Sequence, residues 1–174
     1  MRMRRFTGRN NVGHRQAGQA MVEFALVIFF VFILFVSAVQ MILLMHAYNT
    51  LADAAKEGVR FAIVRGSGNT LCSGPGNPNA NPVVTCPDPS GANVQTTVVN
   101  FAGLAFQNVT ASEVTVDYDP NSANSAAAPA GFGAACSAPG CLVRVTIAHT
   151  YSPFFGLGWP KFTLYAAADG RIMN

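Results

Sequence analysis

The most apolar stretch of the chain extends from residue 24 to residue 45 (FALVIFFVFILFVSAVQMILLM). Its 22 residues include no charge, and only Ser37 and Gln40 are polar. An α-helix rises about 1.5 Å per residue, so this stretch extends about 33 Å and can cross the roughly 30 Å apolar core of a bilayer. The chain has no second stretch of this kind. The pattern predicts one membrane-spanning helix.

A cleaved signal peptide is the alternative for this stretch. The apolar core of a signal peptide is about 7–15 residues long and ends close to a small-residue cleavage site. The apolar run here is longer, and the nearest A-x-A motif, Ala52-Asp53-Ala54, lies well inside a charged helical pattern. We therefore expect a span rather than a signal peptide.

The helical periodicity continues beyond the span with a changed face. Apolar side chains recur at spacings of three and four residues, which predicts the stripe of an amphipathic helix: Leu44, Tyr48, Leu51, Ala55, Val59 and Ala62. Oppositely charged residues three apart, Asp53 with Lys56 and Glu57 with Arg60, lie off this stripe and support an exposed face. We expect one helix over residues 19–65, roughly 70 Å long.

The remainder, residues 66–174, has the pattern of a small α+β domain. Residues 66–91 and 119–140 are rich in Gly, Asn, Pro, Ser and Ala, which predicts loops. Alternating segments predict antiparallel strands at 113–118, 141–151 and 162–168, the last ending at Asp169-Gly170. Three strands are about the minimum for a stable sheet.

Residues 92–106 place Val94, Val98, Phe101 and Ala105 at helical spacing. The β-branched residues of 94–99 leave a strand open as the alternative, and we favour a short helix on the sheet. The expected fold class is therefore α+β and pilin-like. A long N-terminal helix, with a transmembrane half and an amphipathic outer half, packs on a small antiparallel sheet.

Charge changes this picture in one respect, which is orientation. Only 11% of the residues are charged and 51% are hydrophobic, which excludes a disordered charged chain. Residues 1–18 hold five arginines and no acid, whereas residues 19–174 hold six basic and eight acidic residues. The positive-inside rule then predicts a cytoplasmic N-terminus and an outer C-terminal domain. Because the folded part is slightly acidic, we expect no nucleic-acid partner.

The junction between the basic leader and the span carries the clearest functional signal. Gly18 is followed by four residues, then by Glu23 and the aromatic Phe24; neither Gly8 nor Gly13 has an acid five residues later. A carboxylate in an apolar membrane helix is costly and is a functional candidate by default. The helix dipole favours an anion in the first turns. The alternative is that Glu23 lies at headgroup depth without a specific role.

This junction resembles the processing site of type IV pilin-like precursors, and most closely that of the tight-adherence branch, in which Tyr stands in place of Phe24. Together with YNTLADAAKEGVRFAIVRG, the segment resembles the TadE-like pseudopilin family over residues 16–66. The resemblance implies that a membrane-embedded prepilin peptidase cleaves after Gly18 and removes residues 1–18. Gln19 would become the new N-terminus, and Glu23 would set register by pairing with a free amine.

The resemblance also implies a function and its partners. The chain would be a minor pseudopilin acting in assembly, initiation or adhesion of a tight-adherence type IV pilus, held in the bacterial inner membrane with its outer domain in the periplasm. Its partners would be the peptidase, membrane lipid, an inner-membrane assembly platform and other pilin-like subunits (a major pilin and a second minor pseudopilin). The alternative is an uncleaved single-pass anchor whose outer domain binds another envelope protein.

Four cysteines in the outer domain predict disulfides, because that side of the membrane is oxidising. Of the three possible pairings we favour Cys72 with Cys86 and Cys136 with Cys141, since each pair closes one loop-rich segment. A loop of about 15 residues would give the first disulfide roughly 3 kcal/mol on the chain-entropy model. A four-thiolate zinc site is the alternative, but the chain has no C-x-x-C motif.

Motifs for catalysis are sparse, and we expect neither an enzyme nor a cofactor. No G-x-S-x-G, H-E-x-x-H or Walker pattern occurs. His46 and His149 have no adjacent nucleophile or acid motif, so structural roles are expected for both. The alternative, a membrane-tethered hydrolase, would need an acid, a base and a nucleophile clustered in the outer domain. We also expect no metal site, because the calcium-like start at Asp117 has Ser122 in place of the required glycine.

Aromatic residues gather in the segment YSPFFGLGW between the last two predicted strands. Packing over the sheet edge is one interpretation. The other is an exposed contact for a partner subunit, because aromatic side chains are enriched in binding hot spots. The candidate contact residues are Tyr151, Phe154, Phe155 and Trp159.

Overall fold

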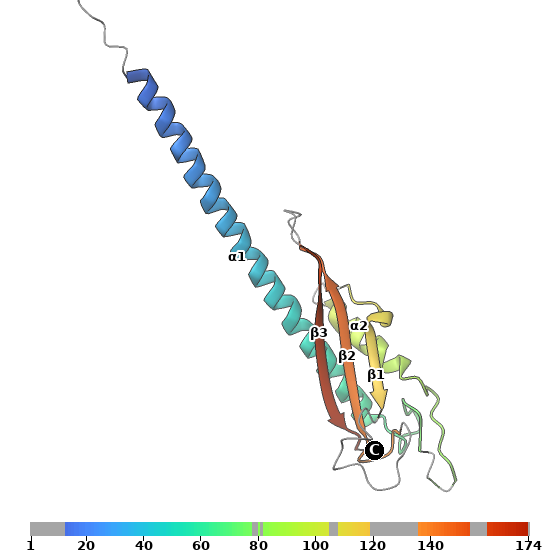
Figure 1. Ribbon diagram of the computed structural model, residues 1–174. Coiled ribbons are helices and arrows are strands. Elements are labelled where there is room, and N and C mark those ends of the chain that lie inside the picture. The colour runs from blue at the N-terminus through green and yellow to red at the C-terminus, as the bar shows by residue number, and fades with distance from the viewer. Residues whose placement is uncertain are drawn as a thin grey trace, which may run out of the picture. The chain divides into compact units, whose positions relative to one another are not determined.

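A computed structural model describes residues 13–77, 80, 82–104, 108–118, 136–153 and 160–173, with side chains from residue 18 onward. The elements in chain order are α1 (Gly13–Val64), α2 (Ala92–Leu104), the short 3₁₀ helix η1 (Ala111–Glu113), β1 (Val114–Tyr118), β2 (Leu142–Tyr151) and β3 (Phe162–Arg171). Figure 1 labels α1, α2, β1, β2 and β3. The chain forms two compact units, Met1–Ile42 and Leu43–Asn174.

The first unit contains the N-terminal part of α1. Within the described residues, α1 is the one helix long and apolar enough to cross a membrane. Its side chains from residue 18 to residue 35 are all exposed, including five phenylalanines. An apolar helix that is exposed on every face has the composition of a membrane span and not that of a soluble core helix. The expectation of a single candidate span is confirmed.

In the second unit, α1 turns one face toward a small hydrophobic core. The buried members of this face are mostly small residues: Ala47, Thr50, Leu51, Ala54, Ala55, Gly58, Val59 and Ala62. The predicted stripe was wrong at its start, because Tyr48 is 47% exposed and Leu44 is only half-buried. Alanines at positions 47 and 54 face the core in their place, which lets the other elements approach the helix closely.

The three strands form one antiparallel sheet in the order β1-β2-β3. Alternate residues of β2 face the core, and Val143, Val145 and Ile147 are fully buried there. On β3 the core-facing positions are half-buried except for Ala166, which is buried. Both α1 and α2 lie on this side of the sheet (Figure 1). The α+β class with a small antiparallel sheet is therefore confirmed.

Residues 92–104 are helical, so the favoured helix is confirmed over the alternative strand. Val94, Val98 and Ala102 form its buried face. Each predicted strand has one boundary that was wrong, and β2 begins at Leu142 and not at Cys141. Glu113 belongs to η1 and not to a strand. In addition, β3 continues through Gly170 to Arg171, because Asp169 is held opposite Arg144 of β2 by a two-pronged ion pair with N–O distances of 2.6 and 3.0 Å.

Two glycines permit the closest contacts between layers. A Cβ atom on Gly58 of α1 would collide with Val98 of α2 and would lie 3.4 Å from Val145 of β2. A Cβ atom on Gly170 of β3 would lie 2.6 Å from the Cδ1 atom of Ile63. The contacts with Val98 and with Ile63 would be closer than side-chain atoms normally approach. The packing of α1 on α2 and β3 therefore requires these glycines.

We expect Gly58→Ala to lower the stability of the outer domain by about 1–2 kcal/mol, because overpacking Val98 outweighs the gain in helix propensity. Gly103→Ala is the matched control: a Cβ atom there meets nothing within 4 Å, so it should be neutral or stabilising by up to about 1 kcal/mol. Thermal unfolding of the detergent-solubilised protein checks both. Equal effects of the two substitutions would contradict this account of Gly58.

Candidate functional site

The residues singled out at the start of the span all lie within α1. Gly18, Gln19, Glu23 and Phe24 are exposed. Gln19 and Glu23 are four residues apart, so they lie on the same face of the helix, about one turn from each other. An amine on residue 19 would therefore be within reach of the Glu23 carboxylate of the same chain, and both groups are open to a neighbouring chain.

Gly18 has no packing reason to be a glycine. A Cβ atom at this position would meet nothing within 4 Å, in contrast to the crowded Gly58. Glycine inside a helix costs roughly 0.5–1 kcal/mol relative to alanine. A glycine that is unfavourable for the helix and unnecessary for packing is a candidate for recognition by another protein.

Two disulfides hold the loops of the outer domain. The structure joins Cys72 to Cys86 and Cys136 to Cys141, which is the pairing favoured from the loop spacing. All four cysteines are buried, with exposed fractions of 7% or less. Because the core is small, such cross-links supply stability that hydrophobic burial alone would not provide.

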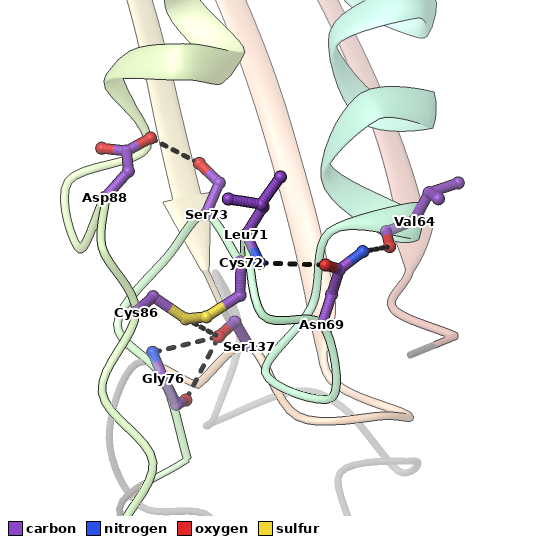
Figure 2. The surroundings of a disulfide bond; sticks show 9 residues. All are labelled: Val64, Asn69, Leu71, Cys72, Ser73, Gly76, Cys86, Asp88 and Ser137. Carbon is purple, nitrogen blue, oxygen red and sulfur yellow. Dashed lines mark hydrogen bonds between the residues drawn. A yellow bond between two sulfur atoms is a disulfide. The ribbon is translucent and has the colours of Figure 1, made fainter.

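Ser137 ties the two cross-linked loops together (Figure 2). Its fully buried hydroxyl accepts a hydrogen bond from the backbone N–H of Gly76 at 3.0 Å and lies 3.7 Å from the Sγ atom of Cys86. Its backbone N–H donates to the carbonyl of Gly76, and its carbonyl accepts from the N–H of Ser67. The loop closed by Cys136 and Cys141 is therefore bonded directly to the loop closed by the other disulfide.

Asp88 joins the same region to α2. Its two carboxylate oxygens accept the backbone N–H groups of Ala92 and Asn93, both at 2.9 Å, and so cap the first turn of α2. The buried hydroxyl of Ser73 donates to Asp88 at 2.6 Å (Figure 2). Burial alone would raise the pKa of Asp88, but the hydrogen bonds from Ser73, Asn93, Ala92 and Ser90 outweigh it and hold the pKa below its ordinary value.

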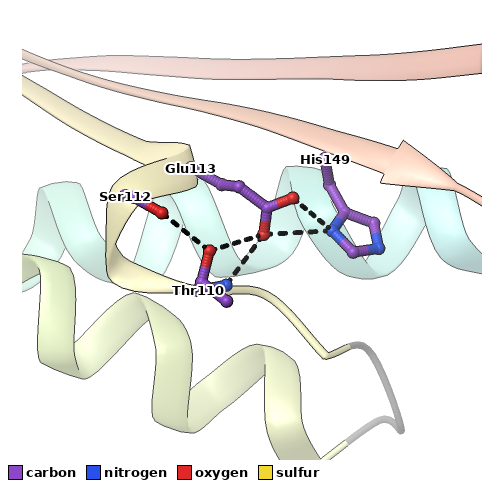
Figure 3. A network of polar contacts seen from close by, with 4 residues as sticks. All are labelled: Thr110, Ser112, Glu113 and His149. Atoms are coloured by element: carbon purple, nitrogen blue, oxygen red, sulfur yellow. Dashed lines mark hydrogen bonds and ion pairs between the residues drawn. The ribbon is translucent and has the colours of Figure 1, made fainter.

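A second polar network connects η1 to β2 (Figure 3). The Glu113 carboxylate accepts the backbone N–H of Thr110 at 2.8 Å and lies 3.2 Å from the Nδ1 atom of His149. Burial would raise the pKa of Glu113, and the bonds from Thr110 and His149 lower it below its ordinary value. Sequence analysis missed this acid because it lies 36 residues from the histidine. The contact fastens the turn at Thr110 to the sheet.

Two further predictions from the sequence concern a metal site and the aromatic segment of residues 151–159. No group of three or more His, Cys, Asp or Glu side chains that could hold a metal ion occurs in the described part of the chain. Of the aromatic candidates, Tyr151 is half-buried, and its ring centroid lies 5.6 Å from that of Phe162 on β3. Phe154, Phe155 and Trp159 lie outside the described residues, so the proposed partner contact stays a prediction.

The fold and the junction define a class: a protein with one N-terminal helix able to span a membrane and a small, disulfide-bearing α+β domain. The family model described as TadE-like protein matches residues 18–60, which confirms the resemblance. The matched segment begins at Gly18 and continues into the outer part of α1. The match indicates a protein associated with the tight-adherence pilus. No significant match was found among curated proteins or among solved structures.

We expect acid to destabilise the outer domain partly through Asp88. Because the pKa of Asp88 is lowered in the folded state, its contribution is present above its ordinary value of 3.8 and is lost as the pH falls through the lower folded-state value. At pH 7 the free energy of unfolding of the wild type should exceed that of Asp88→Asn by about 1 kcal/mol. The reason is that the NH2 group of Asn replaces one of the two oxygens that cap α2. The difference should narrow as the pH falls below 3.8.

Thermal unfolding from pH 7 to pH 3 measures this difference. Asp53→Asn is the control, because Asp53 forms only an exposed ion pair with Lys56 at 3.0 Å, which contributes little to stability. A difference in stability between wild type and Asp88→Asn that stays constant with pH would contradict this role of the Asp88 carboxylate.

Proposed function

We propose that this chain is a minor pseudopilin of a tight-adherence type IV pilus machine, cleaved after Gly18 by a prepilin peptidase. The observation that carries the proposal is the junction: Gly18 and Glu23 stand five residues apart at the start of an exposed apolar helix, inside the segment that matches the TadE-like family. The mechanism is assembly of subunits and not catalysis.

Cleavage has two physical consequences in this mechanism. It removes five arginines and no acid, so a strongly basic leader no longer holds the helix end at the cytoplasmic surface. It also creates an amine on Gln19, the positive partner that Glu23 requires in an apolar environment. The amine and carboxylate pair within one chain or between neighbouring chains, and in the second case the pair fixes the axial register of two packed helices.

The apolar helix serves two stages of this process. In the inner membrane it holds the subunit with the N-terminus in the cytoplasm and the outer domain in the periplasm. During assembly the same surface packs against the helices of other pilin-like subunits, a major pilin and a second minor pseudopilin. The exposed phenylalanines of residues 24–35 provide the contact area for that packing. The outer domain then caps or initiates the fibre.

We expect Glu23→Gln to be cleaved but to fail in assembly. In a strain that lacks this gene, the variant should restore pili at about a tenth of the wild-type level or less, because loss of a buried charge partner costs more than 1.4 kcal/mol. Glu57→Gln is the matched control, since Glu57 forms only an exposed ion pair with Arg60. Pili counted by electron microscopy and pilin co-isolated with the subunit are the two measurements.

Normal piliation by Glu23→Gln would overturn the role of the carboxylate. Normal piliation in cells whose copy of this gene is deleted would overturn the assembly function itself. A subunit that is never cleaved and co-isolates with an unrelated envelope protein would establish the anchor alternative.

A further inference from the structure

The two ends of the sheet differ in their chemistry. β2 ends at Tyr151 and β3 begins at Phe162, and the centroids of these two rings lie 5.6 Å apart. The exposed Lys161 precedes Phe162, and we call these three residues the β2–β3 end. The four residue pairs nearest to it include no acidic side chain. The charged residues of the strands lie at the opposite end: Asp117, Arg144, Asp169 and Arg171.

Close contacts fix the position of β3 along α1. A Cβ atom on Gly170 of β3 would collide with Ile63 of α1. A Cβ atom on Gly58 of α1 would lie 3.4 Å from Val145 of β2, which pairs with Ala168 of β3. Within the second unit, α1 and β3 run in the same direction (Figure 1). The start of β3 is therefore nearer to the beginning of this part of α1 than to its end.

The β2–β3 end lies at the level where the apolar run of α1 stops. Phe162 precedes Ala168 by six residues, which is about 20 Å along a strand. A helix covers this distance in about 13 residues, and counting back from Gly58 leads to about Met45. The contact at the end of β3 leads to the same residue. Because Met45 ends the uncharged stretch of residues 24–45, a membrane that α1 spans has its surface at this level.

The side chains at this level are those that favour a membrane surface. Tyrosine is enriched where the apolar core of a bilayer meets the headgroups, and a lysine places its ammonium among lipid phosphates while its stem stays in the apolar layer. Tyr151 and Lys161 supply both kinds of side chain. Tyr48 of α1, one turn after Met45, is 47% exposed, although the helical pattern predicts that it faces the core. A position among the headgroups gives this exposed ring an amphipathic environment.

From this position and chemistry we infer that the β2–β3 end rests on the membrane surface and binds anionic phospholipid. Lys161 pairs with lipid phosphate, and Tyr151 and Phe162 enter the headgroup layer. The occupant is lipid because a helix that spans the bilayer up to Met45 brings the membrane itself to this end of the sheet. An anionic surface would repel an acid here, and the four nearest strand pairs contain none. The inference rests on membrane insertion of α1, which is part of the proposed function, and is independent of cleavage after Gly18.

Fluorescence quenching in proteoliposomes tests this inference on the full-length chain. The vesicles contain phosphatidylcholine, phosphatidylglycerol and a lipid with a nitroxide on its headgroup, which quenches nearby fluorophores. All four native cysteines are in disulfides, so one added cysteine can carry a small maleimide fluorophore. Thr163→Cys places the fluorophore beside Phe162. Ala167→Cys is the matched control, because it is exposed on the same face of the same strand, about 13 Å farther from the β2–β3 end.

We expect at least about twice as much quenching of the Thr163→Cys label as of the Ala167→Cys label. Adding Lys161→Glu to Thr163→Cys should remove at least about half of this excess, because an anionic surface repels the new carboxylate. Adding Lys56→Glu should leave the excess unchanged, since it alters the net charge equally but replaces an exposed residue on the outer part of α1. Intact native disulfides verify that each variant is folded.

Resistance to extraction by alkaline carbonate shows first that the helix is inserted, and a chain that is released would overturn the inference. Equal quenching of the two labels would also overturn it, whether the sheet stands away from the bilayer or lies flat on it. Quenching that Lys161→Glu leaves unchanged would overturn the binding of anionic lipid. The vesicles contain no prepilin peptidase, so none of these outcomes can be mistaken for a failure of processing.

Discussion

The structure depends on one constraint: a single helix, α1, must satisfy two different surroundings along its length. From residue 18 to residue 35 its apolar side chains are exposed on every face, which only lipid or other apolar helices can satisfy. In the second unit one face of the same helix, built from small residues such as Ala54 and Gly58, is buried under α2 and the sheet. The helix therefore joins a segment long and apolar enough to cross a membrane to a segment that belongs to a folded domain.

The outer domain compensates for its small core with covalent and polar links. The two disulfides close the loops at one end of the sheet, and Ser137 bonds one closed loop to the other. Asp88 then ties this region to the first turn of α2. These groups are buried, so loss of the polar contacts would leave unsatisfied polar atoms, and loss of the disulfides would release the loops. The loops and α2 are therefore stabilised together.

Sequence patterns predicted the elements whose signal is local and missed those set by distant partners. The uncharged run of residues 24–45 was sufficient to predict the candidate span, and the alternation of residues in β2 was sufficient to predict the central strand. The end of β3 was wrong because Asp169 is stabilised by Arg144, 25 residues away, and no local pattern marks that pair. The contact of Glu113 with His149 was missed for the same reason. At the junction, the spacing of Gly18 and Glu23 was visible in the sequence, and the structure adds that Gly18 is not required by packing.

Intact mass and N-terminal sequencing of the membrane-extracted protein, expressed with and without its prepilin peptidase, test the central claim most directly. The account predicts a mature chain that begins at Gln19 when the peptidase is present and a full-length chain when it is absent. Gly18→Asp should leave the chain uncleaved under both conditions. A full-length wild-type chain in the presence of an active peptidase would contradict the account and would favour an uncleaved envelope anchor.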